Sequence, residues 1–132
     1  MTRVWCVTPA MLGAAVAAER HRHGQLALAD VTRLPVRARA FDAVFTSGLL
    51  GHLARPEETL AELARVVRPQ GVLALFHPIG RKALAARQGH RLTDDDLRAE
   101  HRLRPLLARS GWHMTSYVDV DTRFLALAVR RP

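Results

Sequence analysis

Residues 41–75 constrain the fold of this chain most, because they contain the pattern of a strand, a helix and a second strand in direct succession. Residues 41–46 are almost entirely apolar, which is typical of a strand buried on both faces of a parallel sheet. A proline and two glutamates at 56–58 predict a helix start. Apolar side chains then recur at the spacing of one helix face, at Leu60, Leu63, Ala64 and Val67. Residues 72–76 predict the second buried strand.

Shorter elements are predicted before this stretch. Residues 3–7 favour a strand, and the Thr-Pro pair that follows predicts a helix over residues 9–20, since threonine caps helices and proline suits their first turn. Residues 26–29 predict another strand, and a loop should cover residues 31–40. The first half of the chain therefore alternates strands with helices.

The region after the second buried strand is less regular. Residues 77–91 contain two glycines and several basic side chains without a period, which predicts a loop or an irregular helix. Thr93 with the three aspartates that follow it predicts a helix start of the capping-box type. Pro105 should kink or restart that helix, which should end at Ser110 and Gly111.

The C-terminal end predicts a pair of antiparallel strands. Residues 114–120 alternate between apolar and polar side chains, residues 124–129 are continuously apolar, and Asp121 and Thr122 join them as a hairpin. Because helices alternate with strands until this hairpin, we expect an α/β three-layer sandwich with a mostly parallel sheet. A chain of 132 residues is expected to form a single domain over residues 1–132.

Composition limits the class of protein. The chain is 48% apolar but has no apolar run near the length of a membrane span, and its first residues lack the basic and then apolar pattern of a secretion signal. A cytoplasmic protein is expected. The lone Cys6 predicts neither a disulfide nor a zinc site, and the seven dispersed histidines predict no metal site.

The formal charge of +8 raises the alternative of nucleic-acid binding, because basic side chains that neutralise phosphates drive such binding. Nineteen of the 20 basic residues are arginine, and they are scattered over the chain without interleaved aromatic side chains. This pattern favours a solvated surface over a track for phosphates.

Four segments resemble class I S-adenosylmethionine (SAM)-dependent methyltransferases, in particular the small-molecule, type 11-like group. VWCVTPAML is similar to the second strand of that family and the start of its next helix, and LADVTRLPV to the third strand and its adenine-contacting turn. Residues 41–73 resemble the fourth strand, helix and fifth strand, and SGW with the terminal hairpin resembles the usual closure. The resemblance implies a Rossmann-like fold that is truncated at the N-terminus, without the first strand and its glycine-rich SAM-binding loop.

The resemblance also implies a set of site residues. Asp30 corresponds to a carboxylate that accepts a hydrogen bond from the adenine amine, and Val31 to a residue that packs on the base. The residues at the carboxyl end of the fourth strand would lie beside the methionine part of the cofactor: Thr46, Ser47 and Gly48. Leu50 and His52 would lie near the mouth of the substrate site, since open α/β sheets bind ligands beyond the carboxyl ends of their strands.

SAM is therefore the implied cofactor, and weak binding is expected. In the family an acidic residue that ends the second strand holds both ribose hydroxyls, and its position here is Cys6, followed by Val7, in the expected cofactor site. A thiol cannot accept two strong hydrogen bonds, and the glycine-rich loop has no counterpart. The loss costs several kcal/mol, at roughly 1.5–3 kcal/mol for each charge-assisted hydrogen bond.

No catalytic residue is assigned. His52 is the one candidate for a general base, with the alternative that it is a packing histidine, and Asp30 has the alternative of capping the turn after its strand. In this family, methyl transfer often needs little beyond the alignment of the nucleophile with the methyl group.

Three functions stay open at this stage. The first is a SAM-dependent methyltransferase that acts on a small molecule and is divergent or incomplete. The second is a non-catalytic binding or regulatory protein that acts by dimerisation or on a partner methyltransferase, and the third is an arginine-rich nucleic-acid-binding protein. In the family, the missing first strand lies between the strands that correspond to residues 3–7 and 41–46. Exposed apolar strand edges promote aggregation. We therefore expect either that these two strands pair directly or that a second chain covers the gap. A homodimer is expected.

Overall fold

The computed structural model describes residues 4–7, 25–28 and 31–132, which fall into two compact units, Met1–Pro35 and Val36–Pro132. In the first unit, strands β1 (Val4–Val7) and β2 (Gln25–Leu28) pair in parallel, with Val4 opposite Gln25. Both strands were predicted to within one residue. The helix predicted over residues 9–20 lies outside the described residues, and the single domain expected over residues 1–132 stays a prediction.

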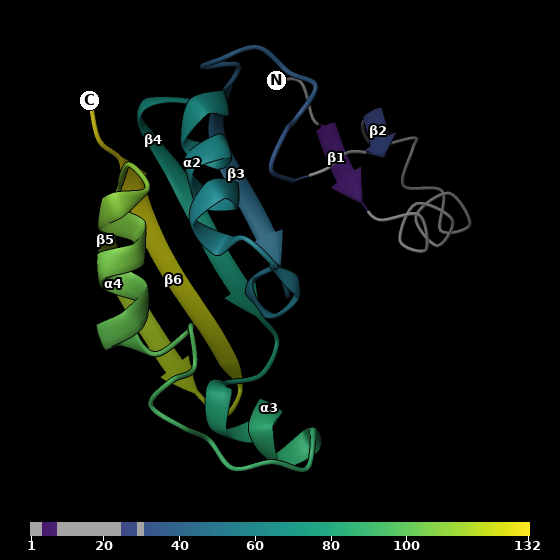
Figure 1. Cartoon of the computed structure of the whole chain (residues 1–132), viewed down its shortest axis with the longest axis vertical. Coiled ribbons are helices and arrows are strands. Elements are labelled where there is room, and N and C mark those ends of the chain that lie inside the picture. Colours follow the sequence, from purple (N-terminus) through teal and green to yellow (C-terminus); the bar gives the residue numbers. More distant parts are fainter. Residues whose placement is uncertain (1–3, 8–24, 29–30) are drawn as a thin grey trace. The chain divides into compact units, whose positions relative to one another are not determined.

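The second unit is built on a four-stranded mixed sheet of order β3-β4-β6-β5 (Figure 1). Strands β3 (Phe41–Ser47) and β4 (Val67–His77) are parallel, while β5 (Trp112–Val120) and β6 (Arg123–Arg130) form the predicted antiparallel hairpin. β6 also pairs antiparallel with β4. The order confirms the expected α/β Rossmann-like fold class, with the hairpin inserted beside β4.

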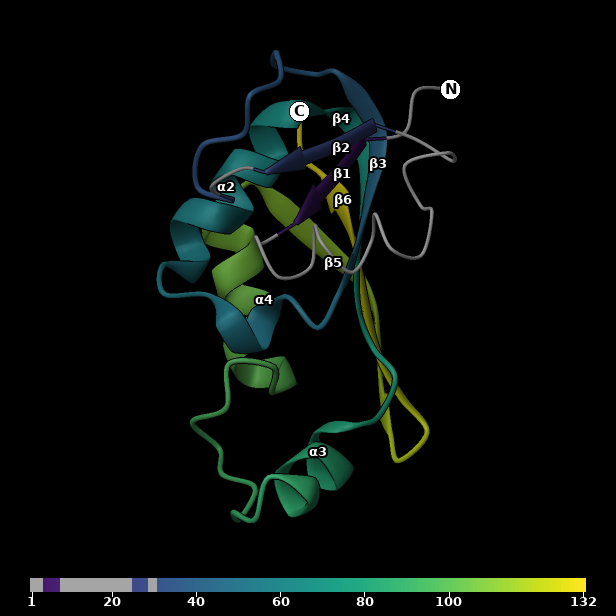
Figure 2. The ribbon, with the colours of Figure 1, turned by 90° about the vertical axis from the view of Figure 1, so that its right-hand side faces the viewer.

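Helices α2 (Pro56–Val66) and α4 (Glu100–Arg109) lie on the same face of this sheet (Figure 2). α2 begins as predicted, with Pro56 in its first turn and Glu57 and Glu58 at the positive end of the helix dipole. The core lies between the helices and the sheet. Its largest fully buried side chains are Trp112, Leu60, Leu73, Leu75, Leu103 and Leu107. Burial of this apolar surface holds the two helices to the sheet.

The prediction that residues 41–46 and 72–76 are buried on both faces is wrong for the described residues. Exposure alternates along β4, where Leu73 and Leu75 are buried against the helices while Val72, on the other face, is 39% exposed. Phe45 of β3 is 67% exposed. The physical reason is that the described helices that pack on the sheet, α2 and α4, cover one of its faces, so the apolar side chains of the opposite face have less cover.

The connection from α2 to the sheet is tighter than predicted, because β4 begins at Val67, directly after the helix. The start of β4 is irregular where it follows the helix so closely. The pairing of β3 with β4 shifts its register between Phe41 and Ala43, and Gln70 adopts a positive φ of 69°. A Cβ atom on Gly71 would meet the backbone oxygen of Asp42 at 2.7 Å, so the close approach of the strands here requires glycine.

The helix predicted to start at Thr93 starts at Glu100 instead, so the capping-box prediction is wrong. The Asp96 carboxylate does not cap a helix, because it is bonded to two arginine side chains. The predicted restart at Pro105 does not occur either, since α4 continues through it. Pro105 has no N–H to donate to the carbonyl of His101, four residues earlier. Both residues are exposed, so water can bond this carbonyl instead.

The remaining predicted features of this region are confirmed in outline. The loop or irregular helix expected over residues 77–91 contains one short helix, α3 (Arg81–Arg87). α4 ends where predicted, and Gly111 follows it with a φ of 95°, as is common for the glycine after a helix. None of the helices in the described part of the chain has the length and apolar character needed to cross a bilayer.

Candidate functional site

The parallel strands β3 and β4 end side by side, and a cavity of about 10 Å³ lies at their carboxyl ends. Three of the predicted site residues line it: Thr46, Gly48 and Leu50. Ser47 ends β3 opposite Phe76 and does not line the cavity. The structure thus brings together three of the five residues that the resemblance placed beside the cofactor and the substrate mouth.

The turn after β3 depends on Gly48. Its N–H donates a 2.9 Å hydrogen bond to the Phe76 carbonyl oxygen, and its φ of 70° lies in the region that favours glycine. A Cβ atom at this position would meet only Cδ2 of His77, at 3.9 Å, so the backbone of the turn is open to a close approach. The chain then enters the 3-10 helix η2 (Leu50–His52), whose first residue, Leu50, is buried.

The other predicted site residues belong to different parts of the chain. Cys6 and Val7 end β1 in the first unit, and Asp30 lies outside the described residues. Val31 is half-buried in a turn, and His52 ends η2. Their roles in binding SAM or a substrate stay predictions.

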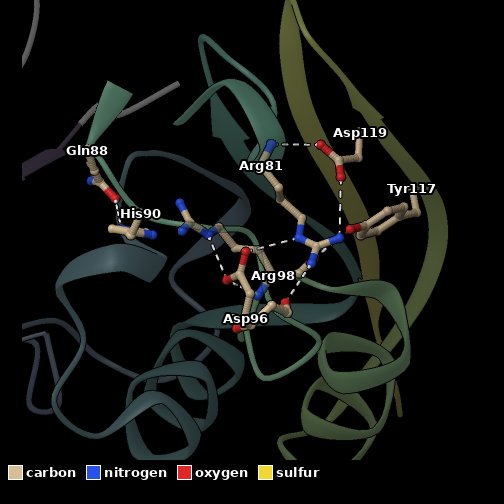
Figure 3. Close-up of polar contacts among 8 residues, drawn as sticks. Arg81, Gln88, His90, Asp96, Arg98, Tyr117 and Asp119 are labelled. Atoms are coloured by element: carbon tan, nitrogen blue, oxygen red, sulfur yellow. Dashed lines mark hydrogen bonds and ion pairs between the residues drawn. The ribbon is translucent and has the colours of Figure 1, made fainter. Parts of the chain in front are cut away.

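Sequence analysis missed a network of charged side chains that anchors the region after β4 to the hairpin (Figure 3). The Arg81 N–H donates a 2.8 Å hydrogen bond to the carboxylate of Asp119 on β5, and the Arg81 guanidinium donates from Nε to Asp96 at 3.0 Å. Asp96 also accepts a hydrogen bond from Nε of Arg98 at 3.2 Å. The hydroxyl of Tyr117 donates a 2.5 Å hydrogen bond to the Arg98 carbonyl.

This network is mostly shielded from water, since the side chains of Arg81 and Asp96 are 13% and 14% exposed. Burial acts to raise the pKa of Asp96, but hydrogen bonds from Arg98 and Arg81 and the charge of Arg98 outweigh it, so the pKa lies below the usual 3.8. Burial, with the charge of Asp119, raises the pKa of Tyr117 above 10.0. At neutral pH Asp96 therefore stays ionised, as does Arg81, whose pKa is raised despite burial by the hydrogen bond to Asp96, and Tyr117 stays neutral.

The network reaches the cavity through Arg98, which lines it together with His77. The Ile79 N–H donates a 3.2 Å hydrogen bond to Nδ1 of His77. A signal in the sequence could have pointed to His77, since it directly follows the strand predicted over residues 72–76, at the edge where α/β proteins bind ligands. Within the described residues, no three histidine, cysteine, aspartate or glutamate side chains gather into a metal-binding group.

Comparisons with known proteins agree with this geometry. A family model described as a methyltransferase domain matches residues 2–75. A chain of the complex between the Haloferax volcanii Trm112 methyltransferase activator and a methyltransferase is 16% identical, with a TM-score of 0.77, and the match covers 99% of this chain and 73% of that one. No curated protein sequence matches.

Two further solved structures have the same fold. A SAM-dependent methyltransferase from Clostridium acetobutylicum is 11% identical, with a TM-score of 0.75 over 100% of this chain and 76% of that one. A structure that concerns the conversion of a disulfide bond into a thioacetal group during echinomycin biosynthesis is 22% identical in sequence. Its TM-score is 0.77, and the match covers 98% of this chain and 67% of that one. At these identities the likeness concerns the fold.

Proposed function

Because this chain belongs to the methyltransferase domain family, we propose that it is a SAM-dependent methyltransferase domain that acts on a small molecule and that binds SAM weakly by itself. SAM is the methyl donor of that family and would supply the methyl group. The observation that carries the proposal is the cavity at the carboxyl ends of β3 and β4, where Thr46, Gly48 and Leu50 meet. Ligands of open α/β sheets bind at this edge.

The residues at this edge fit part of the cofactor. The open backbone at Gly48 suits a close approach by the methionine part of SAM, with Thr46 and Ser47 beside it. Leu50 and His52 would border the methyl acceptor, and Asp30 and Val31 would hold the adenine. The residues of this chain would align the two reactants and exclude water. Alignment of the nucleophile with the methyl group supplies much of the rate of a methyl transfer.

Weak affinity follows from Cys6, which stands where the family has a carboxylate for the ribose. We expect a dissociation constant for SAM weaker than about 10 μM, which corresponds to roughly −7 kcal/mol. Calorimetric titration of the chain with SAM tests this, and a tighter constant would overturn it. The Asp30→Ala variant should weaken binding more than His52→Ala, since the carboxylate would bond the adenine directly. Absence of any SAM binding would overturn the proposed function itself.

A small molecule as methyl acceptor is supported by the fold of the protein from echinomycin biosynthesis. The apolar side chains at this edge support it too, namely those of Leu50, Leu75 and Phe124, because sites for small ligands are lined mostly by apolar groups.

A second candidate function is supported by the sheet itself. Among the described strands of the second unit, β3 pairs only with β4, and Phe45 of this edge strand is 67% exposed. An apolar edge of this kind is a template for strand pairing with another chain. A second copy of the chain would cover it, in a homodimer that binds or regulates a partner methyltransferase rather than carrying out catalysis. The complex of the Haloferax volcanii methyltransferase with its activator is a precedent for a partner in this fold.

A further inference from the structure

One hydrogen bond orients the guanidinium of Arg98 beside the cavity, and two further hydrogen bonds hold the backbone of this residue. Its backbone N–H donates to Oδ1 of Asp96 at 3.1 Å, its Nε donates to the same oxygen at 3.2 Å, and its carbonyl accepts the hydrogen bond from Tyr117 (Figure 3). The Arg98 side chain is 17% exposed. These three contacts leave its two terminal nitrogens without a hydrogen-bond partner among the described residues, so a shielded cation retains several unused donors.

Asp96 is shared between Arg98 and Arg81, and Arg81 has a second carboxylate partner, Asp119, at 3.5 Å. The Arg81 Nε donates to Oδ2 of Asp96 at 3.0 Å, while Arg98 occupies Oδ1. Two arginines therefore meet two aspartates, and Asp96 contacts Nε of Arg98 but neither of its terminal nitrogens. The terminal N–H groups of a guanidinium form a fork that matches a carboxylate, so the arrangement favours an acidic ligand.

His77 supplies a second donor at the same place. Because Nδ1 of His77 accepts the hydrogen bond from the Ile79 N–H, the neutral imidazole carries its proton on Nε2. Nε2 is therefore a hydrogen-bond donor rather than a base. The Thr46 hydroxyl donates its one proton to the Ala74 carbonyl oxygen at 3.2 Å, so the donors that a ligand can use are those of Arg98 and His77.

The size of the cavity limits what these donors can hold. A volume of about 10 Å³ has room for about one water-sized atom. The remaining wall includes the apolar side chains of Leu50, Leu75 and Phe124. Such a space accepts a single oxygen atom and excludes a bulky group.

We propose that Arg98 and His77 form a subsite that binds one carboxylate oxygen of the ligand that enters at the carboxyl ends of β3 and β4. The carboxylate belongs either to the methyl acceptor or to the methionine part of the cofactor. The inference rests on the proposed function for the location of the ligand. It adds a recognition element, a guanidinium oriented by Asp96, that would select ligands with an acid group.

The first experiment uses formate, the smallest carboxylate, and does not need SAM. Titration with formate, followed by NMR signals of the Arg98 Nε–H and the His77 ring, should give saturable shifts. The Arg98→Gln variant should weaken this binding by at least about tenfold, which corresponds to about 1.4 kcal/mol. Arg98→Lys, which keeps the charge, should retain more of the affinity than Arg98→Gln. Arg102→Gln removes one exposed charge from α4 and should change nothing.

A second experiment identifies the source of the carboxylate. S-adenosylhomocysteine carries the amino-acid carboxylate, and 5′-methylthioadenosine lacks it. If Arg98→Gln weakens the binding of S-adenosylhomocysteine but not of 5′-methylthioadenosine, the subsite binds the carboxylate of the cofactor. If it weakens the binding of neither compound but abolishes formate binding, the subsite binds the carboxylate of the methyl acceptor. Formate shifts that do not saturate, or that persist unchanged in a folded Arg98→Gln variant, would overturn the subsite without bearing on whether SAM binds.

Discussion

The indole Nε1 of Trp112 donates a 2.9 Å hydrogen bond to the backbone carbonyl oxygen of Leu60, and both side chains are completely buried. This bond joins the start of β5 to the middle of α2, 52 residues apart in the sequence. It therefore fixes the C-terminal hairpin to the helix that precedes β4, and through β4 to the edge where the candidate site lies.

Replacing Trp112 with phenylalanine should destabilise the second unit. The substitution removes the hydrogen bond to Leu60 and part of a side chain that is 0% exposed. We expect a loss of about 1–3 kcal/mol in the free energy of unfolding, measured by urea denaturation. The neighbouring exposed position provides the control, since His113→Phe should stay within about 0.5 kcal/mol of the unsubstituted chain. Equal losses in both variants would contradict the role of the buried bond.

The Asp96 network should make stability depend on acidic pH. Because the pKa of Asp96 in the folded chain lies below 3.8, its ionised form stabilises the fold above pH 3.8, and this contribution is lost as the pH falls through the lower folded value. The unfolding free energies of the unsubstituted chain and Asp96→Asn should therefore differ at pH 6 and converge below about pH 3.8. Asp94, which is exposed and outside the network, is the matched control as Asp94→Asn. A constant difference across this pH range would exclude Asp96 as the source.

The exposed edge of β3 predicts self-association. Sedimentation at micromolar concentration should show a dimer, and Phe45→Glu should convert it into a monomer without loss of folding, because this side chain is 67% exposed. Ala108→Glu places the same charge on the exposed face of α4 and should leave the dimer intact. A well-behaved monomer of the unsubstituted chain would rule out the dimer and favour direct closure of the sheet within one chain.

The basic surface should give only non-specific affinity for nucleic acids. Seven arginines of the described residues form ion pairs with carboxylates, which lowers the charge available for phosphates: Arg55, Arg65, Arg68, Arg81, Arg98, Arg104 and Arg109. Binding to DNA should fall steeply as salt rises to about 200 mM, since it depends on counterion release. Gel-shift titrations at several salt concentrations check this. Binding that persists at this salt concentration with a clear sequence preference would instead support a nucleic-acid-binding function.

Local patterns in the sequence were sufficient where one short segment carries the whole signal. The start of α2 at Pro56, the strands on either side of it and the hairpin turn at Asp121 and Thr122 all follow from spacing and turn chemistry within a few residues. The resemblance to methyltransferases placed Thr46, Gly48 and Leu50 at the carboxyl end of a strand or just beyond it, and the structure has these three residues lining one cavity there.

Only the tertiary structure decided the role of Asp96. The residues around Asp96 predict a helix start, yet its carboxylate binds Arg81, 15 residues earlier, and α4 starts only at Glu100. The same fold brings Arg98 to the cavity beside His77. Capping is a local interaction that sequence spacing can express, whereas a shared ion pair depends on which segments the sheet brings together, and the burial that strengthens it exists only after packing.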